Sequence, residues 1–146
     1  MKSIALVSCV AKKQERTSVA KDLYCSPWFK KAKAYVESQG WQWYILSAKY
    51  GLLEPEKLVE PYDQTLNQMP TQVRYEWAED VFNHICRRFP ERGKVIILAG
   101  KKYRQYLCPH LEKAGYTIAV PLMGLGIGQQ LNWFDNQPVE TLNQNE

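Results

Sequence analysis

The sequence predicts an α/β protein, a three-layer α/β/α sandwich built on a mostly parallel, four-stranded sheet. Four short apolar runs rich in Val, Ile and Leu recur along the chain. They are continuous rather than alternating, which is typical of strands buried on both faces. Segments with helical spacing separate these runs, and this alternation of strand and helix favours a parallel sheet covered by helices.

The expected strands cover residues 4–7, 43–46, 95–99 and 117–122. A first helix begins at Pro27, because proline suits the first helical position, and it ends before Gly40. The clearest helical pattern runs over residues 70–89, where apolar residues recur every four positions. A third helix is expected over residues 101–114. A last helix follows the glycine-rich stretch at residues 124–128.

The chain of 146 residues is long enough for one domain with a sizeable core. Residues 1–135 are expected to form this domain, and residues 136–146 a polar C-terminal tail. The connection from Leu53 to Met69 shows little periodicity. Long connections of this kind inside compact domains tend to act as lids or binding loops.

Composition narrows the classes of function. The net charge of +4 is compatible with a polyanionic partner, but it is far below that of a protein that coats nucleic acid. No apolar run reaches the length of a membrane span, and the N-terminal run is too short for a signal peptide. The four cysteines form no CxxC pair, and two distant histidines do not complete a zinc site. We therefore expect a cytoplasmic protein with reduced thiols, no cofactor and no membrane partner.

Candidate binding residues follow each expected strand, where open α/β sheets bind their ligands. Small residues, lysines and glycines recur there, so that backbone N–H and ammonium groups could converge on an anion. These residues are Ser8, Cys9, Lys12 and Lys13, then Ser47, Lys49, Tyr50 and Gly51, then Gly100, and finally Gly124 and Gly126. The alternatives are solvated loops for Lys49 and Tyr50, a helix cap for Gly124 and Gly126, and a buried structural thiol for Cys9.

The stretch Glu60-Pro61-Tyr62-Asp63 is the expected place for acid–base chemistry. Proline fixes the backbone beside the carboxylates, and Tyr62 could wall a pocket for a flat substrate. A carboxylate at the lip of a pocket can orient water or stabilise a developing cation. The alternative is a turn in which Asp63 caps the next segment. Tyr24 and Ser26 border the first helix, where an aromatic ring could stack on a base or could simply pack.

Several blocks of the sequence carry a family resemblance. They are Ser8-Cys9-x-x-Lys12-Lys13, Asp22-Leu23-Tyr24-x-Ser26-x-x-Phe29, residues 46–53, Pro61-Tyr62-Asp63-x-Thr65-Leu66, Gly100-x-x-Tyr103 and the segment from Gly124 to Gln129. Together they resemble a bacterial and phage family of small domains often labelled peroxide stress protein YaaA-like. The chain is also distantly similar to the uracil-DNA-glycosylase-like domain attached to archaeal tRNA-guanine transglycosylase relatives. This likeness implies a glycosylase-type sandwich and a nucleobase or nucleic-acid ligand.

The sequence and the resemblance together favour an N-glycosylase-like hydrolase acting on a base–sugar bond in nucleic acid or a nucleotide. Lys12 and Lys49 would hold phosphate, and Tyr24 and Tyr62 would flank the base. Glu60 or Asp63 would handle water, so that Lys49, Glu60 and Asp63 are the expected catalytic residues. Gly124, Gly126 and Gln129 would bring backbone close to the ligand. One alternative is a nucleic-acid- or nucleotide-binding module without turnover, in a stress or phage-related pathway. Another is a surface for a protein partner.

Overall fold

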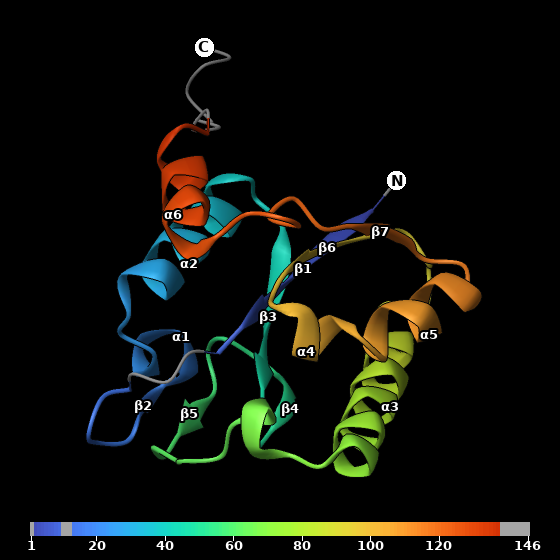
Figure 1. The fold of residues 1–146 in the computed structure, drawn as a ribbon, viewed down its shortest axis with the longest axis horizontal. Coiled ribbons are helices and arrows are strands. Elements are labelled where there is room, and N and C mark those ends of the chain that lie inside the picture. Colours follow the sequence, from blue (N-terminus) through green and yellow to red (C-terminus); the bar gives the residue numbers. More distant parts are fainter. Residues whose placement is uncertain (1, 10–12, 138–146) are drawn as a thin grey trace.

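The computed structural model describes residues 2–9 and 13–137, and Figure 1 shows its arrangement of strands and helices. A five-stranded sheet has the order β4-β3-β1-β6-β7. Its parallel strands are β1 (Ser3–Ser8), β3 (Gln42–Ser47), β6 (Lys94–Leu98) and β7 (Thr117–Ala119). The edge strand β4 (Gly51–Leu53) runs antiparallel to β3. A separate two-stranded sheet pairs β2 (Ser18–Val19) with β5 (Leu58–Val59).

Helices cover both faces of the large sheet, as expected for a three-layer α/β fold. One face packs on α1 (Ala20–Leu23), α2 (Pro27–Ser38) and α6 (Ile127–Asp135). The other packs on α3 (Thr71–Arg88), α4 (Lys101–Arg104) and α5 (Leu107–Lys113). A 3-10 turn, η1 (Leu66–Gln68), precedes α3. No helix in the described part of the chain is both long and apolar enough to cross a bilayer.

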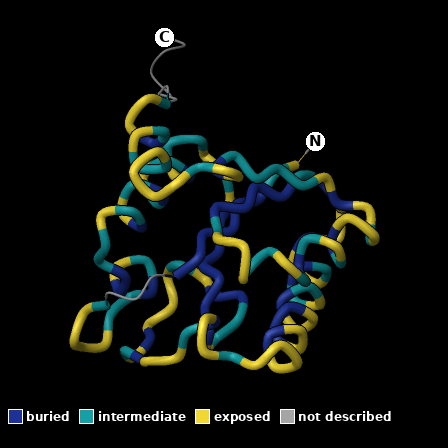
Figure 2. The backbone as a smooth tube through the Cα atoms, viewed as in Figure 1, coloured by how far each residue is buried: buried dark blue, intermediate teal, exposed yellow. Residues whose placement is uncertain are grey.

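Alternate residues of the central strands feed two separate cores. On β1, Ala5 and Val7 face the core beneath α2, whereas Ile4 and Leu6 face the core beneath α3. The strands are therefore buried on both sides, which explains why they read as continuous apolar runs. Figure 2 shows this burial along the centre of the sheet.

Local signals in the sequence account for the helix ends. Ser26 caps α2, since its Oγ accepts a hydrogen bond from the Phe29 amide at 3.1 Å, and Pro27 is the first helical residue. Pro70, expected inside the helix over residues 70–89, instead precedes α3 as its N-cap. Gly40 follows α2 with a φ of 73°, a conformation that glycine adopts without strain.

The prediction of four strands is wrong, because β4 adds a fifth. This strand has only three residues, and it forms when the chain reverses after β3 and Gly51 adopts a φ of 68°. Leu52 and Leu53 then pair with Leu46 and Ile45. The fourth expected strand also ends early, at Ala119 rather than at residue 122. Pro121 lies beyond this end, and proline has no N–H to donate to a strand partner.

Two other segments differ from the prediction. The helix expected over residues 101–114 is broken into α4 and α5, because Pro109 cannot donate to the carbonyl of Gln105 and its ring would clash there. The connection over residues 53–69 contains β5 and η1, so it is less irregular than expected. The last helix starts at Ile127, two residues after Leu125, and takes in Gly128.

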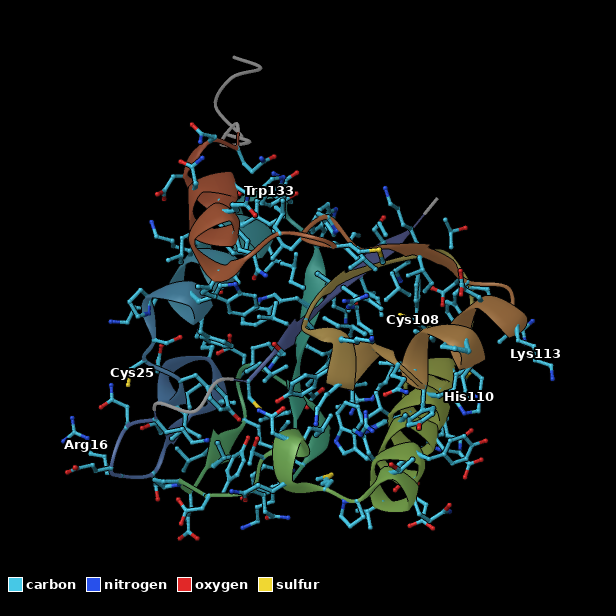
Figure 3. All side chains as sticks on the ribbon, in the orientation of Figure 1. Arg16, Cys25, Cys108, His110, Lys113 and Trp133 are labelled. Carbon is cyan, nitrogen blue, oxygen red and sulfur yellow. The ribbon has the colours of Figure 1, made fainter. Side chains whose placement is uncertain are left out.

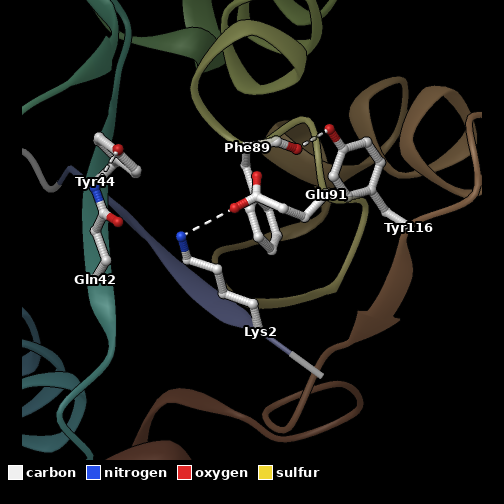
Figure 4. Close-up of polar contacts among 6 residues, drawn as sticks. All are labelled: Lys2, Gln42, Tyr44, Phe89, Glu91 and Tyr116. Atoms are coloured by element: carbon white, nitrogen blue, oxygen red, sulfur yellow. Dashed lines mark hydrogen bonds and ion pairs between the residues drawn. The ribbon is translucent and has the colours of Figure 1, made fainter.

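The amino-terminal edge of the sheet is held by polar contacts (Figure 4). The hydroxyl of Tyr116 donates to the carbonyl oxygen of Phe89 at 2.6 Å. Nearby, Lys2 Nζ lies 3.0 Å from a carboxylate oxygen of Glu91. These contacts tie together the segments that lead into β1, β6 and β7. Different side chains lie at the opposite edge, where the parallel strands end.

Candidate functional site

Neighbouring parallel strands end side by side, as the sequence predicted. In the register of the sheet, Ser8 of β1 lies opposite Leu46 of β3, and the amide of Cys9 donates to the Leu46 carbonyl at 3.0 Å. Ser8 and Ser47 therefore occupy the same edge, and both are buried. Figure 1 shows β1 and β3 converging there. Buried hydroxyls at strand ends need hydrogen-bond partners, and these define the site.

Three hydroxyl groups meet at this edge. Ser47 Oγ lies 2.7 Å from Tyr62 Oη, and Tyr62 Oη lies 2.5 Å from Tyr24 Oη. The backbone N–H groups of Lys49 and Tyr50 both donate to Ser47 Oγ, at 3.2 and 3.0 Å. A serine oxygen has two lone pairs. Since both are engaged, Ser47 donates its own proton to Tyr62.

Cys9 and Tyr103 extend this group of side chains. Cys9 Sγ lies 3.2 Å from the hydroxyl of Tyr103, which comes from α4. The ring of Tyr103 packs edge-on against Trp77, with centroids 5.7 Å apart. Trp77 in turn donates from Nε1 to the carbonyl of Ser47 at 2.9 Å. We call Cys9, Tyr24, Ser47, Tyr62 and Tyr103 the strand-end cluster.

The strand-end tyrosines are neutral hydrogen-bonding groups. Burial raises the pKa of Tyr24, of Tyr62 and of Tyr103 well above the usual value for a phenol. Each therefore keeps its proton at physiological pH. The three tyrosines therefore provide O–H groups rather than negative charge, so an anionic ligand would meet no repulsion from these phenols.

Two lysines lie beside these aromatic rings. Lys13 Nζ is 4.6 Å from the ring centroid of Tyr62 and 5.8 Å from that of Tyr24. Lys49 Nζ is 5.3 Å from the ring centroid of Tyr50. These distances lie within the range of cation–π contacts. The Tyr50 ring packs edge-on against Tyr62, with centroids 5.6 Å apart. Lys49 is exposed, so its ammonium group is accessible from solvent.

The predicted role of two tyrosines needs correction. Tyr24 and Tyr62 were expected to flank a base with their rings, but they are only 1% and 8% exposed. Stacking needs an open ring face, which neither of them offers. They instead contribute their hydroxyl groups to the hydrogen bonds of the cluster. Tyr50 is half-buried and is better placed to meet a flat ligand.

Several predicted site residues have local structural roles. Ser26 caps α2, Gly51 makes the turn into β4, and Gly126 is the N-cap of α6 with its amide donating to Gln129 Oε1 at 2.9 Å. Gly124 has a φ of 83°, which favours glycine in the turn before α6. Gly100 precedes α4 and is exposed. For Gly126 and Gln129, the helix-cap alternative accounts for what the structure shows.

The expected catalytic carboxylates lie at the surface. Glu60 and Asp63 are both exposed, on either side of the buried Tyr62. Lys12, expected to hold phosphate, falls outside the described residues. Among residues 2–9 and 13–137, no group of three or more His, Cys, Asp or Glu side chains could hold a metal ion. All four cysteines are free, and Cys9 is buried.

Sequence reasoning missed two members of this environment. Trp77 was interpreted as part of a helical apolar stripe, and nothing in its spacing distinguishes a tryptophan that binds a strand-end carbonyl from one that only packs. Tyr103 was assigned to a helix face, and the block Gly100-x-x-Tyr103 was the available signal. Its contact with Cys9 spans 94 positions of the sequence, which no local pattern reveals.

Comparisons with known proteins show relatives but no established activity. The uncharacterized protein YfjM of Bacillus subtilis (strain 168) is 30% identical over 119 residues, covering 73% of this chain and 75% of that protein. No solved structure matches significantly. Neither the matching family nor this relative is described as YaaA-like or glycosylase-like. Residues 4–136 match the family described as a family of unknown function (DUF6884), and the chain belongs to that family.

Proposed function

We propose that this protein binds a nucleotide or nucleic acid at the strand-end cluster and hydrolyses a base–sugar N-glycosidic bond there. The observation that carries the proposal is the position of two lysines beside aromatic rings at this edge: Lys13 lies over Tyr62 of the cluster, and Lys49 lies over Tyr50, which packs against Tyr62. Ligands of open α/β sheets bind at this edge. Cationic side chains are suited to bind a phosphate group, and aromatic rings with neutral hydrogen-bond donors are suited to bind a base.

Each part of such a ligand has a partner in the cluster or beside it. The exposed ammonium group of Lys49 is suited to a phosphate, which it contacts as a mobile point charge. The half-buried ring of Tyr50 can pack against a base. The protonated hydroxyls beneath, which include Tyr62, can donate to base or sugar oxygens. The resemblance to glycosylase-like domains supports the same ligand class and the finer glycosylase-type sandwich.

The reaction requires that positive charge on the sugar be stabilised. The C1′–N bond breaks with its electron pair going to the base, and the oxygen of water bonds to C1′. One water proton ends on the base, and the other remains on the new hydroxyl group at C1′. A carboxylate near the sugar stabilises the oxocarbenium-like state. Glu60 and Asp63 flank Tyr62 in the chain and are the acids proposed for this role.

The second candidate is a binding protein for the same ligands without turnover. The observation that favours it is the exposure of Glu60 and Asp63, which make no ion pair or hydrogen bond in the part of the chain that is described. Catalytic acids are usually held in place by their neighbours. Lys49 and Tyr50 would bind ligand in the same way in either case.

One experiment separates the two candidates. Single-stranded oligonucleotides containing each common base, and the matching nucleoside monophosphates, are incubated with the protein, and free base is measured by liquid chromatography and mass spectrometry. Fluorescence anisotropy of labelled oligonucleotides measures binding in parallel. We expect base release by the wild type, and a loss of about 100-fold or more in kcat for Glu60→Gln or Asp63→Asn.

The lysine variants test binding. Lys49→Ala is expected to weaken binding about tenfold, because a charged contact is worth about 1.5 kcal/mol. The matched control is Lys113→Ala, since Lys113 is an exposed lysine at the far end of α5 (Figure 3). Binding without base release would exclude the enzyme and leave the second candidate. If no oligonucleotide or nucleotide bound, both candidates would be wrong.

A further inference from the structure

A hollow lies between α4, α5 and β7, and its lining includes no residue of the strand-end cluster, although Tyr103 of that cluster also belongs to α4. Its volume is about 430 Å³, within the range of small-molecule pockets. Lys101 and Arg104 of α4 contribute cationic side chains to it. Ile118, Val120 and Met123, from β7 and the turn after it, contribute an apolar wall. The hollow therefore offers charge from one element and an apolar surface from another.

A buried guanidinium stands behind this hollow. Arg74 of α3 is only 8% exposed, and its Nε is buried without a hydrogen-bond partner. Its Nη1 donates to Oε1 of Gln105 at 2.6 Å, and its guanidinium carbon lies 5.3 Å from the ring of Tyr106. No carboxylate of the described residues pairs with it. A buried cation that lacks a counter-charge is unfavourable unless an anion lies nearby.

Arg74 also fixes the orientation of Gln105, which lines the hollow. A guanidinium can only donate hydrogen bonds, so the amide oxygen of Gln105 must face Arg74. The amide NH₂ group of Gln105 is then left as a hydrogen-bond donor. Arg104 is anchored in a similar way, because its Nε donates to the Ala99 carbonyl at 3.0 Å. Its terminal nitrogens make no hydrogen bond within the described chain.

We propose that this hollow binds a nucleoside monophosphate, with phosphate against the α4 side chains and the base against the apolar wall. Glu112 is the one acid among its lining residues, and it is outnumbered by Lys101, Arg104 and the unneutralised Arg74. An anion is therefore favoured. Met123 is 61% exposed, and a flexible thioether adapts to a flat ring. This site does not rest on the glycosidase proposal.

Cys108 provides a direct probe, because it lines the hollow and is marked on α5 in Figure 3. Alkylation by N-ethylmaleimide is followed by mass spectrometry with and without adenosine 5′-monophosphate (AMP). Burial raises the pKa of the Cys108 thiol, so its unprotected reaction is slow enough to time. We expect millimolar AMP to slow labelling of Cys108 several-fold. Cys86, half-buried and outside the hollow, serves as an internal control and should not change.

Variants and partial ligands make the test specific. Lys101→Ala is expected to weaken AMP protection about tenfold, whereas Lys113→Ala on the same side of the molecule should not change it. Lys101 is exposed, so its removal is not expected to disturb folding. Adenosine and inorganic phosphate, each tested alone, should protect Cys108 much less than AMP. Unchanged labelling with AMP, equal protection by either fragment, or full protection in Lys101→Ala would overturn the proposal.

Discussion

Removing the hydroxyl group of Ser47 should destabilise the protein strongly for so small a change. Ser47 is fully buried, and its Oγ makes hydrogen bonds with the amides of Lys49 and Tyr50 and with the hydroxyl of Tyr62. At about 1 kcal/mol for each bond, Ser47→Ala should lower the free energy of unfolding by about 3 kcal/mol. Partial access of water to the two amides would reduce this value, and unsatisfied buried donors would raise it.

Urea unfolding, followed by tryptophan fluorescence, measures this loss. The buried Trp43 and Trp77 give a signal that reports on both faces of the sheet. A matched control is Ser38→Ala, since Ser38 is half-buried and makes a single bond, to the Tyr35 carbonyl at 2.7 Å. That carbonyl lies at the end of α2, where water can replace the hydroxyl. We expect a loss of about 1 kcal/mol or less there.

A double-mutant cycle tests the assignment of the hydrogen bond between Ser47 and Tyr62. Tyr62→Phe leaves the Ser47 proton without its acceptor, so the two single changes share one interaction. The double variant should lose less stability than the sum of the single variants, by about 1 kcal/mol. A loss of less than about 1 kcal/mol for Ser47→Ala alone, or strict additivity in the cycle, would refute the reasoning.

Two other measurements test the energetics of the fold. Burial raises the pKa of Tyr116 to about 12, so the unfolded chain, with a phenol pKa of about 10, releases this proton first as the pH rises. The contribution of Tyr116 to stability should be constant below about pH 10 and be lost between pH 10 and 12, so Tyr116→Phe should reduce the slope of stability against pH over that interval in urea titrations. Gly93→Ala places a methyl group 2.1 Å from the Lys2 carbonyl oxygen, so we expect a loss of about 3 kcal/mol, whereas Gly128→Ala, with no atom within 4 Å, should be neutral or slightly stabilising. Equal melting temperatures for the two glycine variants would contradict this expectation.

The layered fold could be predicted because its signals are local. Helical spacing located α3 to within a residue at each end, since its apolar face must meet the sheet at every turn. Continuous apolar runs located the parallel strands for a similar reason. Pro109 is the local signal for the break between α4 and α5. The apolar periodicity continues across it, whereas the helical hydrogen bonds of the backbone cannot. The strand β4 was missed because a three-residue strand carries no period of its own.

The edge of the sheet that carries the candidate site could also be predicted, but not the partners within it. Ser47 was recognised as a small polar residue after an apolar run, and this places it at a strand end whatever its neighbours are. The pairing of Tyr24 with Tyr62 spans 38 positions, and it depends on how β2, β5 and α1 pack together. The burial of these two tyrosines is likewise a property of the folded chain. It shows that they contribute hydroxyl groups rather than open ring faces.

The arrangement of the strand-end cluster links its polar chemistry to the stability of the turn after β3. Ser47 accepts from the amides of that turn and so positions the exposed Lys49 and the half-buried Tyr50. The O–H group of Ser47 donates to Tyr62, whose raised pKa keeps the phenol protonated. A hydrophobic residue in place of Ser47 would pack at least as well in a buried position, but it would leave both amides unpaired. The polar network therefore holds a lysine and an aromatic ring at the edge of the sheet where the parallel strands end, and a purely apolar core could not hold them there.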